Sequence, residues 1–578
     1  MGDTESSLSL KQIQQMARSG TPGLALKLLD AQHPGLTKGS EEWFRWSRAR
    51  TEILVARKSW ELADQHLRDL PAELPESLQR WALSQRAWLL LESDRAPSAR
   101  ELLRELIWQY GARAQDTAEE SLWRRMVIRS YMLEDRIDDA ATAMHRYQQD
   151  FAGRQAQWLQ LRARILLRQG RADIVLELPP EAVEKLSSPI RLLAQLRSGQ
   201  IAAEQIIDAT RKLIDDEATT AAEQARLYKI ITEAAQVKSD FPSALSALEH
   251  ALELADELPL SDKLFAVSSD ELWRVYQSYG EILANQSQLL VGDDVGWINE
   301  IRTAVETNAL VRAKSLIVAM IAVTQSHSRR AQLMVQLANV LNVQYGNWRV
   351  VERLFLHSDR FPEMSYVPES VRAALVEQAI ERSDMVLASN LLASLRDTGT
   401  AADLASNLRR ARVMIFGGRA DAGFDVLNGI LDRELFLEAE QLDQFMQVIF
   451  DLQAAEQHQY ALQLFLRLEK ERSLPAERRR ELFFWLAESY EATRQYPLAA
   501  LYFMRSATYT NPQGSDLWGQ SARYRAAEVL TEAGLLSDAR HLYESLLAIT
   551  ADDARRAVLR GKIQQLWVVP ADPENVGN

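Results

Sequence analysis

The stretch that decides the fold runs from residue 480 to residue 503 and reads RELFFWLAESYEATRQYPLAALYF. Large apolar residues and small ones alternate at helical spacing on both sides of a short polar break, as Phe483, Ala487, Tyr490, Ala499 and Phe503 show. Small side chains at 487 and 499 let two helix backbones approach closely, so that the flanking aromatic rings interlock. The stretch therefore predicts two helices packed as a hairpin.

Small residues recur along the chain at a nearly constant distance. In the C-terminal third they are Ala422, Ala461, Ala499 and Ala539, separated by 39, 38 and 40 residues. Near the N-terminus they are Ala25, Ala63, Ala99 and Ala140, separated by 38, 36 and 41 residues. One hairpin of this length cannot bury its apolar face alone, so successive hairpins must stack. We expect an all-α fold, an α-solenoid whose concave wall binds a partner.

The best repeat resembles the tetratricopeptide repeat. Counting from Arg480, the positions that carry large or small residues in that family are Phe483, Leu486, Ala487, Tyr490, Tyr496, Ala499 and Phe503, followed by Asn511-Pro512. Gly534, and similarly Gly417-Gly418, stand where the first helix of a hairpin must end and the chain reverse, a place that favours a positive φ. The resemblance implies a right-handed superhelix of helical hairpins and a role in binding other proteins or peptides.

The repeat pattern divides the chain into parts. We expect N-terminal repeats over 1–180, a divergent helical middle over 181–360 with a non-repeat loop near 287–298, C-terminal repeats over 361–570, and a polar tail over 571–578. Prolines support the boundaries, because Pro179-Pro180 ends a helix and Phe361-Pro362 interrupts the helical pattern.

Composition and charge argue against some classes of ligand and some cellular locations. The 578 residues carry a formal net charge of -13, which opposes attraction to phosphate backbones, so we expect no nucleic-acid ligand. We find no apolar run of the ~18 residues that a membrane-spanning helix needs. The complete absence of cysteine favours an oxidising compartment, here the bacterial periplasm, although the N-terminal residues do not read as a secretory signal and the cytoplasm stays the alternative. The oligomeric state is left open.

Catalytic signatures are missing from the sequence. There is no Gly-rich phosphate loop, no Gly-x-Ser-x-Gly elbow and no His-Glu-x-x-His helix, and the eight histidines stand singly. We therefore expect no catalytic residue, no cofactor and no metal. One enzymatic alternative is the helical superstructure of soluble lytic transglycosylases, but the Gly-Leu-Met-Gln segment that follows their catalytic Glu is absent here. A cytoplasmic regulator built of such repeats is another alternative.

The central loop holds a pair of carboxylates. Asp293 and Asp294 suit a hard cation or a basic partner, because adjacent carboxylates raise the local negative potential. The same pair also suits a solvated turn between Gly292 and Gly296. Trp297, which ends this loop, is a candidate aromatic contact for a partner.

A basic helix face is the second candidate surface. Arg164, Arg168 and Arg171 stand at i, i+4 and i+7, so they share one face. An acidic peptide, polysaccharide or headgroup could bind there. Alternatively, carboxylates of the next hairpin balance this stripe.

The third candidate surface comes from the resemblance. Repeats of this family that grip a C-terminal carboxylate use Lys and Asn at the fifth and ninth positions of the first helix. Here those positions hold Phe484 and Glu488, and in the next repeat Tyr524 and Glu528. The carboxylate clamp is absent, and the aromatic and acidic groove suits an apolar or basic helix of a partner. Taken together, the sequence predicts a non-enzymatic interaction scaffold, and we expect it in a bacterial envelope or secretion assembly.

Overall fold

The computed structural model describes residues 9–32, 37, 39–57, 59–71, 74–111, 117–151, 156–283, 294–345, 348–395, 403–433, 438–470, 474–511 and 516–568. Within these ranges the regular structure is helical throughout and contains no strand. The helices follow one another as packed neighbours, so the predicted all-α solenoid fold is confirmed. The chain divides into two compact units, Met1–Pro362 and Glu363–Asn578.

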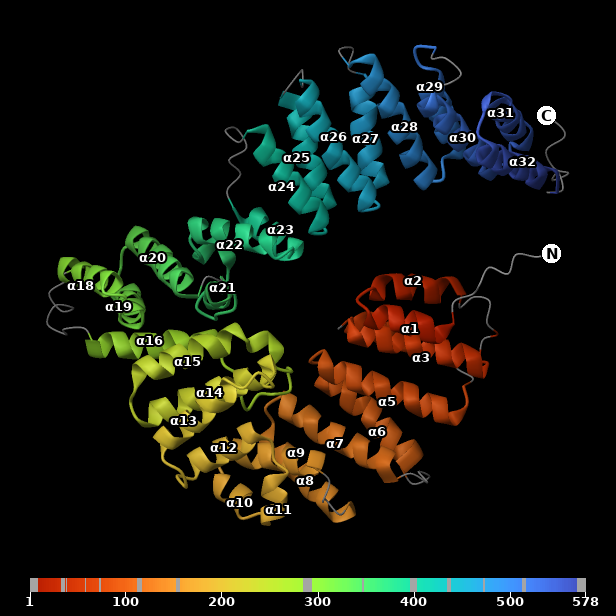
Figure 1. Cartoon of the computed structure of the whole chain (residues 1–578). Helices are drawn as coiled ribbons and strands as arrows, with labels where there is room; N and C mark the ends of the chain where they lie inside the picture. Colours follow the sequence, from red (N-terminus) through yellow and green to blue (C-terminus); the bar gives the residue numbers. More distant parts are fainter. Residues whose placement is uncertain are drawn as a thin grey trace. The chain divides into compact units, whose positions relative to one another are not determined.

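The first unit holds helices α1 to α21, most of which pack on their neighbours in the sequence (Figure 1). Their bounds are α1 Leu10–Arg18, α2 Pro22–Gln32, α3 Glu41–Ala56, α4 Trp60–Arg68, α5 Glu76–Glu92, α6 Ala96–Tyr110, α7 Thr117–Leu133, α8 Ile137–Asp150, α9 Ala156–Arg168, α10 Ala172–Leu176, α11 Pro180–Glu184, α12 Ser188–Arg197, α13 Ala203–Ile214, α14 Ala221–Val237, α15 Phe241–Glu253, η3 Ala255–Glu257, α16 Ser269–Leu283, α18 Asp294–Glu306, α19 Leu310–Val323, α20 His327–Tyr345 and α21 Arg349–Leu356.

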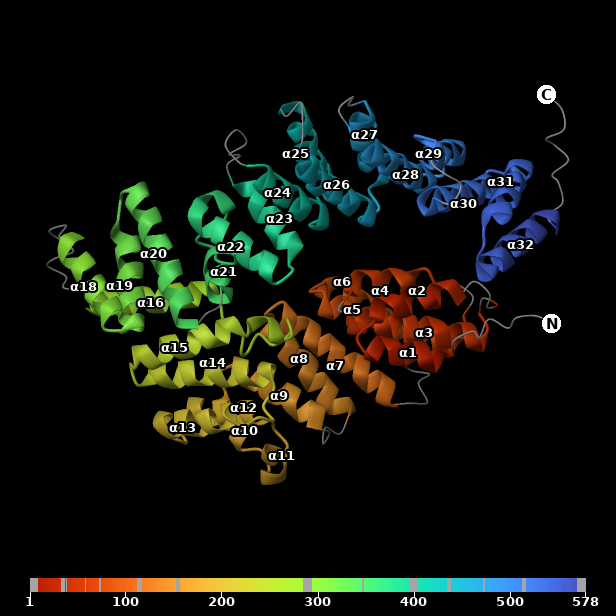
Figure 2. The ribbon, with the colours of Figure 1, turned by 45° about the horizontal axis from the view of Figure 1, so that its top comes forward.

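The second unit is more regular, and Figure 2 shows its hairpins following one another in chain order. Its helices are η4 Met364–Tyr366, α22 Glu369–Glu381, α23 Met385–Ser394, α24 Leu404–Phe416, α25 Ala420–Arg433, α26 Ala439–Ala454, α27 His458–Glu469, α28 Ala476–Ala492, α29 Tyr496–Thr508, α30 Leu517–Glu532, α31 Leu536–Ile549 and α32 Asp553–Val568. We call the first helix of each hairpin helix A and the second helix B.

One turn geometry joins helix A to helix B in both units. The residue that ends the turn has a positive φ, and the amide that follows it donates to the carbonyl oxygen five residues earlier over 2.8 to 3.1 Å. This left-handed cap satisfies carbonyl groups that the end of a helix leaves without a partner. Among the described residues it occurs at Gly20, Asp94, Asp135, Gly170, Ser239, Asn308, Ser383, Gly418, Glu456, Arg494 and Gly534. The positive φ predicted at Gly534 is confirmed, and at the Gly417-Gly418 pair it belongs to Gly418.

A buried residue follows each of these turns at a constant distance of five positions, where helix B crosses helix A. The residues are Ala25, Ala99, Ala140, Val175, Ala244, Ala313, Ala388, Gly423, Ala461, Ala499 and Ala539. The sequence prediction of Ala422 for this role is wrong by one residue, because Ala422 is half-buried and Gly423 is buried. A Cβ at Gly423 would lie 2.7 Å from Ile415 Cγ1, so the crossing there leaves no room for a side chain.

The middle of the chain keeps this turn and the buried residue five positions after it, although small residues no longer recur there at a constant distance. Ser239, Asn308 and Ser383 make the same turn, and Ala244, Ala313 and Ala388 follow at the same distance. Additional helices and extended segments separate these hairpins, so the spacing between turns grows well beyond one repeat. Of the loop expected near 287–298, residues 287–293 lie outside the described residues, whereas residues 294–298 belong to helix α18. The four-part division of the chain stays a prediction.

The core of this middle region contains an ion pair that is closed to solvent. Lys314 of α19 lies 2.5 Å from Glu249 of α15, and both side chains are fully buried. The hydroxyl of Tyr276, on α16, donates to the same carboxylate oxygen. Burial lowers the pKa of Lys314, and the charge of Glu249 opposes that shift. Because a buried charge is costly without a partner, this triad fixes the packing of three helices at once.

Candidate binding site

The helix A face of the second unit contains a hollow of about 510 Å³ between α28, α30 and α32. Phe484 and Glu488 reach it from α28, and Tyr524 reaches it from α30. Counted from Arg480, where the repeat begins, Phe484 and Glu488 stand at its fifth and ninth positions, and Tyr524 stands at the fifth position of the next repeat. The structure therefore brings together three of the four residues that the resemblance pointed to in this region.

The apolar wall of the hollow is held in place by aromatic contacts. The ring of Phe484 lies 5.1 Å from that of Phe503 and 5.2 Å from that of Trp518, centroid to centroid. The ring of Tyr524 meets that of Tyr543 edge-on at 5.7 Å. Such edge-to-face pairs stabilise one ring orientation by about 0.5–1.5 kcal/mol beyond area burial. The wall is therefore largely formed before any partner arrives.

Glu488 is the carboxylate of this hollow that keeps free capacity to accept a hydrogen bond. It is half-buried and accepts no hydrogen bond from any described residue. Burial raises the pKa of Glu488, while the Arg525 guanidinium acts in the opposite direction. A carboxylate that has lost part of its water without gaining a donor is suited to pair with an incoming cation.

The neighbouring charges are already paired with one another. Arg525 donates to Glu491 over 2.9 Å and to Glu528 over 3.3 Å, and Lys562 donates to Glu528 over 3.1 Å. Glu528 thus takes part in a network beside the hollow and is not one of its lining residues. Its carboxylate positions Arg525, which does line the hollow.

Several residues that line the hollow were not predicted from the sequence. Arg525 and Arg555 bring positive charge, so the hollow is less acidic than expected, and Val558 adds an apolar side chain that is 54% exposed. Arg525 could have been considered from the sequence, because it directly follows Tyr524, which the repeat resemblance places at the groove. Arg555 and Val558 carry none, since α32 lies beyond the last repeat that the pattern reveals.

The prediction that Arg164, Arg168 and Arg171 share one helix face is wrong for Arg171, because α9 ends at Arg168 and Arg171 is the N-cap residue of α10, beyond the turn at Gly170. The two arginines that α9 does carry form ion pairs within the chain. Arg164 lies 2.5 Å from Asp262, whose second oxygen accepts from Arg226 over 2.7 Å. Arg168 pairs with Asp135 and donates to the carbonyl oxygen of Lys263 over 3.0 Å. Arg171 is exposed and makes no ion pair with a described residue.

Asp262 belongs to a segment of irregular backbone that lies on the helix A side of the first unit. We call residues 258–265 the inner strap. Asp262 is 2% exposed and Phe265 is fully buried against the core that contains Leu227 and Ile230. The hollow of about 500 Å³ that α5, α7 and α9 line is bounded by this strap. The carboxylate that balances the basic stripe therefore comes from a segment 98 residues further along the chain, and not from the next hairpin.

The remaining candidates lie in or next to residues 284–293, which are outside the described residues. Asp293 lies outside the described residues, and Asp294 is the first residue of α18. Trp297 lies within α18 and is 4% exposed, so its ring packs inside the unit. An indole in this position contributes to the core and not to an exposed contact.

Among the described residues, no group of three or more His, Cys, Asp or Glu side chains is placed to hold a metal ion. Within the same described ranges, no helix combines the length and the apolar character that crossing a bilayer requires.

The fold and the hollow define the class of protein as an α-solenoid of helical hairpins with a groove on its helix A face. No protein-family model matches the chain, and no curated protein matches it. Solved structures that are similar include the APC/C hetero-tetramer Cut9-Hcn1, with 13% identity over 97% of this chain and 96% of that one, at a TM-score of 0.28. The pentatricopeptide repeat protein PPR10 from maize gives 13% identity over 99% and 90%, at a TM-score of 0.30. Yeast Tom70 gives 10% identity over 86% and 96%, at 0.21.

Proposed function

We propose that this chain is a non-enzymatic scaffold that binds a helical segment of a partner protein in the hollow between α28, α30 and α32. The observation that carries the proposal is the pairing of a preformed aromatic wall, at Phe484 and Tyr524, with the carboxylate of Glu488, which accepts no hydrogen bond from a described residue. The segment that fits presents an apolar side chain to the rings and a Lys or Arg to Glu488. Affinity comes from the desolvated apolar contact, and the ion pair fixes the register.

The first experiment uses synthetic helical peptides of about fifteen residues with a Leu and a Lys at i and i+4. Fluorescence anisotropy measures their affinity for the full chain and for Glu488→Gln. The matched control is Glu544→Gln, an exposed glutamate on α31. We expect Glu488→Gln to weaken binding about five-fold and the control to leave it unchanged. Equal affinity of the wild-type chain and Glu488→Gln would contradict the proposal.

A second experiment identifies the partner in native cells. A photo-crosslinking amino acid replaces Ser521, which lines the hollow on α30, or Ser545, an exposed serine on α31. We expect a crosslinked protein from position 521 that is lost when Glu488→Arg is added, and none from position 545. The same products from both positions would show that the hollow is not the site.

We further propose a bacterial envelope or secretion assembly as the setting, on the cysteine-free composition of the chain. Fractionation of native cells tests this setting, and recovery from the cytoplasm alone would contradict it.

Incubation of the purified chain with peptidoglycan tests the absence of enzymatic activity. Release of soluble muropeptides would overturn the assignment as a scaffold without catalysis.

A further inference from the structure

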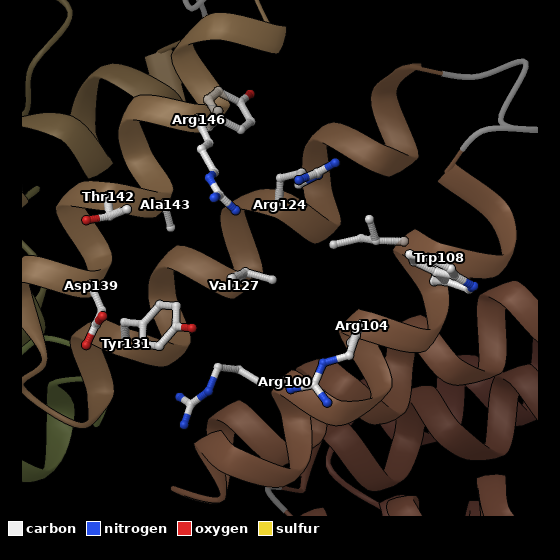
Figure 3. A pocket seen from close by; sticks show the side chains of 12 residues that line it. Arg100, Arg104, Trp108, Arg124, Val127, Tyr131, Asp139, Thr142, Ala143 and Arg146 are labelled. Carbon is white, nitrogen blue, oxygen red and sulfur yellow. The ribbon is translucent and has the colours of Figure 1, made fainter.

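A second hollow, of about 340 Å³, lies in the first unit between helices α6, α7 and α8. Four arginines line it: Arg100, Arg104, Arg124 and Arg146. Figure 3 shows Arg100 and Arg104 on one side of the hollow, on α6, and Arg146 on the opposite side, on α8. A concentration of positive charge is unexpected in a chain with a net charge of -13.

Only some of this positive charge is neutralised within the chain. Arg100 lies 2.6 Å from Glu134, and Arg124 lies 3.2 Å from Glu120. The acidic residue in the lining, Asp139, is paired with Arg136 over 2.8 Å. These pairs account for the carboxylates that face the hollow.

Arg104 and Arg146 are left without such a partner. Both are exposed, and neither forms an ion pair or hydrogen bond with a described residue. Helix α6 also carries Glu101 and Glu105, but neither of them lines the hollow. Two guanidinium groups on facing helices are therefore available for carboxylates from outside, for which the planar fork of arginine is well matched.

An apolar contact surface adjoins these arginines. Trp108, on the same helix as Arg104, is 87% exposed, the highest value among the large apolar side chains of the described residues. Ile107 and Val127 continue the apolar surface into the hollow. An exposed indole can bury a large area at a small entropic cost, which is why tryptophan is enriched among residues that dominate binding energy.

We propose that this hollow binds a short acidic segment of a partner protein, with two carboxylates on Arg104 and Arg146 and an apolar or aromatic side chain on Trp108. The overall negative charge of the chain disfavours a long polyanion, whereas a short segment meets the local positive charge alone. The hollow lies in the first unit, between two B helices, α6 and α8, and helix A α7, so this proposal stands apart from the groove at α28, α30 and α32.

The test uses three fluorescein-labelled peptides of about twelve residues. The first contains several Asp and Glu residues and one Phe, the second has Ala in place of Phe, and the third has amides in place of the carboxylates. We expect the first peptide to bind best. The charge-reversed double variant Arg104→Glu/Arg146→Glu should weaken its binding at least about ten-fold. Trp108→Ala should weaken the Phe peptide about five-fold and leave the Ala peptide nearly unchanged.

A matched control is available on α13, where Arg211 and Lys212 are both exposed. Arg211→Glu/Lys212→Glu makes the same change in net charge away from the hollow, and we expect less than about a two-fold loss. An equal loss in the control, or equal binding of the acidic peptide and its amide counterpart, overturns the proposal. Tighter binding of a single-stranded RNA oligonucleotide that the double variant abolishes also overturns it. If the double variant unfolds, Arg104→Gln/Arg146→Gln and Trp108→Ala provide the same comparison.

Discussion

The hairpins of the second unit and the middle of the first unit are joined by different kinds of electrostatic contact. In the second unit, ion pairs link consecutive A helices, as Arg412–Asp451 at 2.6 Å and Arg525–Glu491 at 2.9 Å do, with side chains that are 20–47% exposed. In the middle, Lys314 and Glu249 are fully buried and lie 65 residues apart. The comparison indicates that weak, partly exposed ion pairs between neighbouring hairpins are sufficient in the regular array. Where additional helices interrupt the hairpins, a buried ion pair holds the helices together.

The largest expected effect comes from removing one partner of the buried link. Lys314→Ala leaves the Glu249 carboxylate buried without its cation, so we expect a loss of roughly 3–5 kcal/mol in the free energy of unfolding. Urea denaturation of the full chain measures it. The control Arg412→Ala breaks an exposed tie and should cost less than about 1 kcal/mol. Equal losses would remove the distinction between the two regions.

Removing the buried charge of the inner strap should have the next largest effect on the free energy of unfolding. Asp262→Asn removes a buried charge that Arg164 and Arg226 share, which we expect to cost about 2–3 kcal/mol. Hydrogen exchange should then become faster in residues 258–265 than in α9. Unchanged exchange there would show that apolar contacts at Phe265 alone hold the strap.

Overpacking a hairpin crossing comes third. Ala499→Leu inserts a large side chain where the helices of the best repeat meet, and we expect a loss of about 1–3 kcal/mol. Ala422→Leu makes the same substitution one residue before a crossing, at a half-buried position, and should cost less than about 0.5 kcal/mol. Thermal melts followed by circular dichroism compare the two variants. A larger loss in Ala422→Leu would contradict the crossing assigned to Gly423.

Substitutions in the turns between helix A and helix B should change the stability of the chain by smaller amounts and in opposite directions. Gly534 has φ 75° and Arg494 has φ 59° at equivalent places. Because a side chain strains this conformation, Gly534→Ala should destabilise the chain by about 1 kcal/mol, and Arg494→Gly should stabilise it by up to about 1 kcal/mol. Shifts of the same sign in both variants would argue against a shared left-handed cap.

The smallest effect depends on pH and comes from Glu488. The pKa of Glu488 is raised above 4.5, so the folded chain binds more protons at this site and its contribution to stability falls as the pH rises above 4.5. Glu488→Gln should therefore raise the melting temperature slightly at neutral pH, and this gain should vanish below pH 4.5. A gain that persists in acid would point to a cause other than ionisation.

The sequence predicted the hairpins where aromatic and small residues repeat regularly, and it predicted Gly534 at a turn. It did not reveal the same turn at Ser239 or Asn308, because residues other than glycine occupy the left-handed position and inserted helices obscure the spacing. The pairing of Arg164 with Asp262 was equally hidden, since a contact over 98 residues leaves no local pattern. Contacts between residues far apart in the sequence could not be predicted, mainly because of that separation and less because of the chemistry of the side chains.

The candidate groove shows the same limit. Phe484, Glu488 and Tyr524 could be predicted because the positions of helix A that face the groove follow from the repeat resemblance. Arg555 and Val558 could not, since they belong to a final helix that has no helix B among the described residues. Burial raises the pKa of Glu488, and that burial arises only when three helices come together.

The inner strap has a consequence for recognition. A segment tethered to its own binding wall acts at an effective local concentration of the order of millimolar for short flexible tethers. A ligand that pairs with Arg164 through its own carboxylate must displace Asp262 from Arg164, so the inner strap competes with it for that arginine.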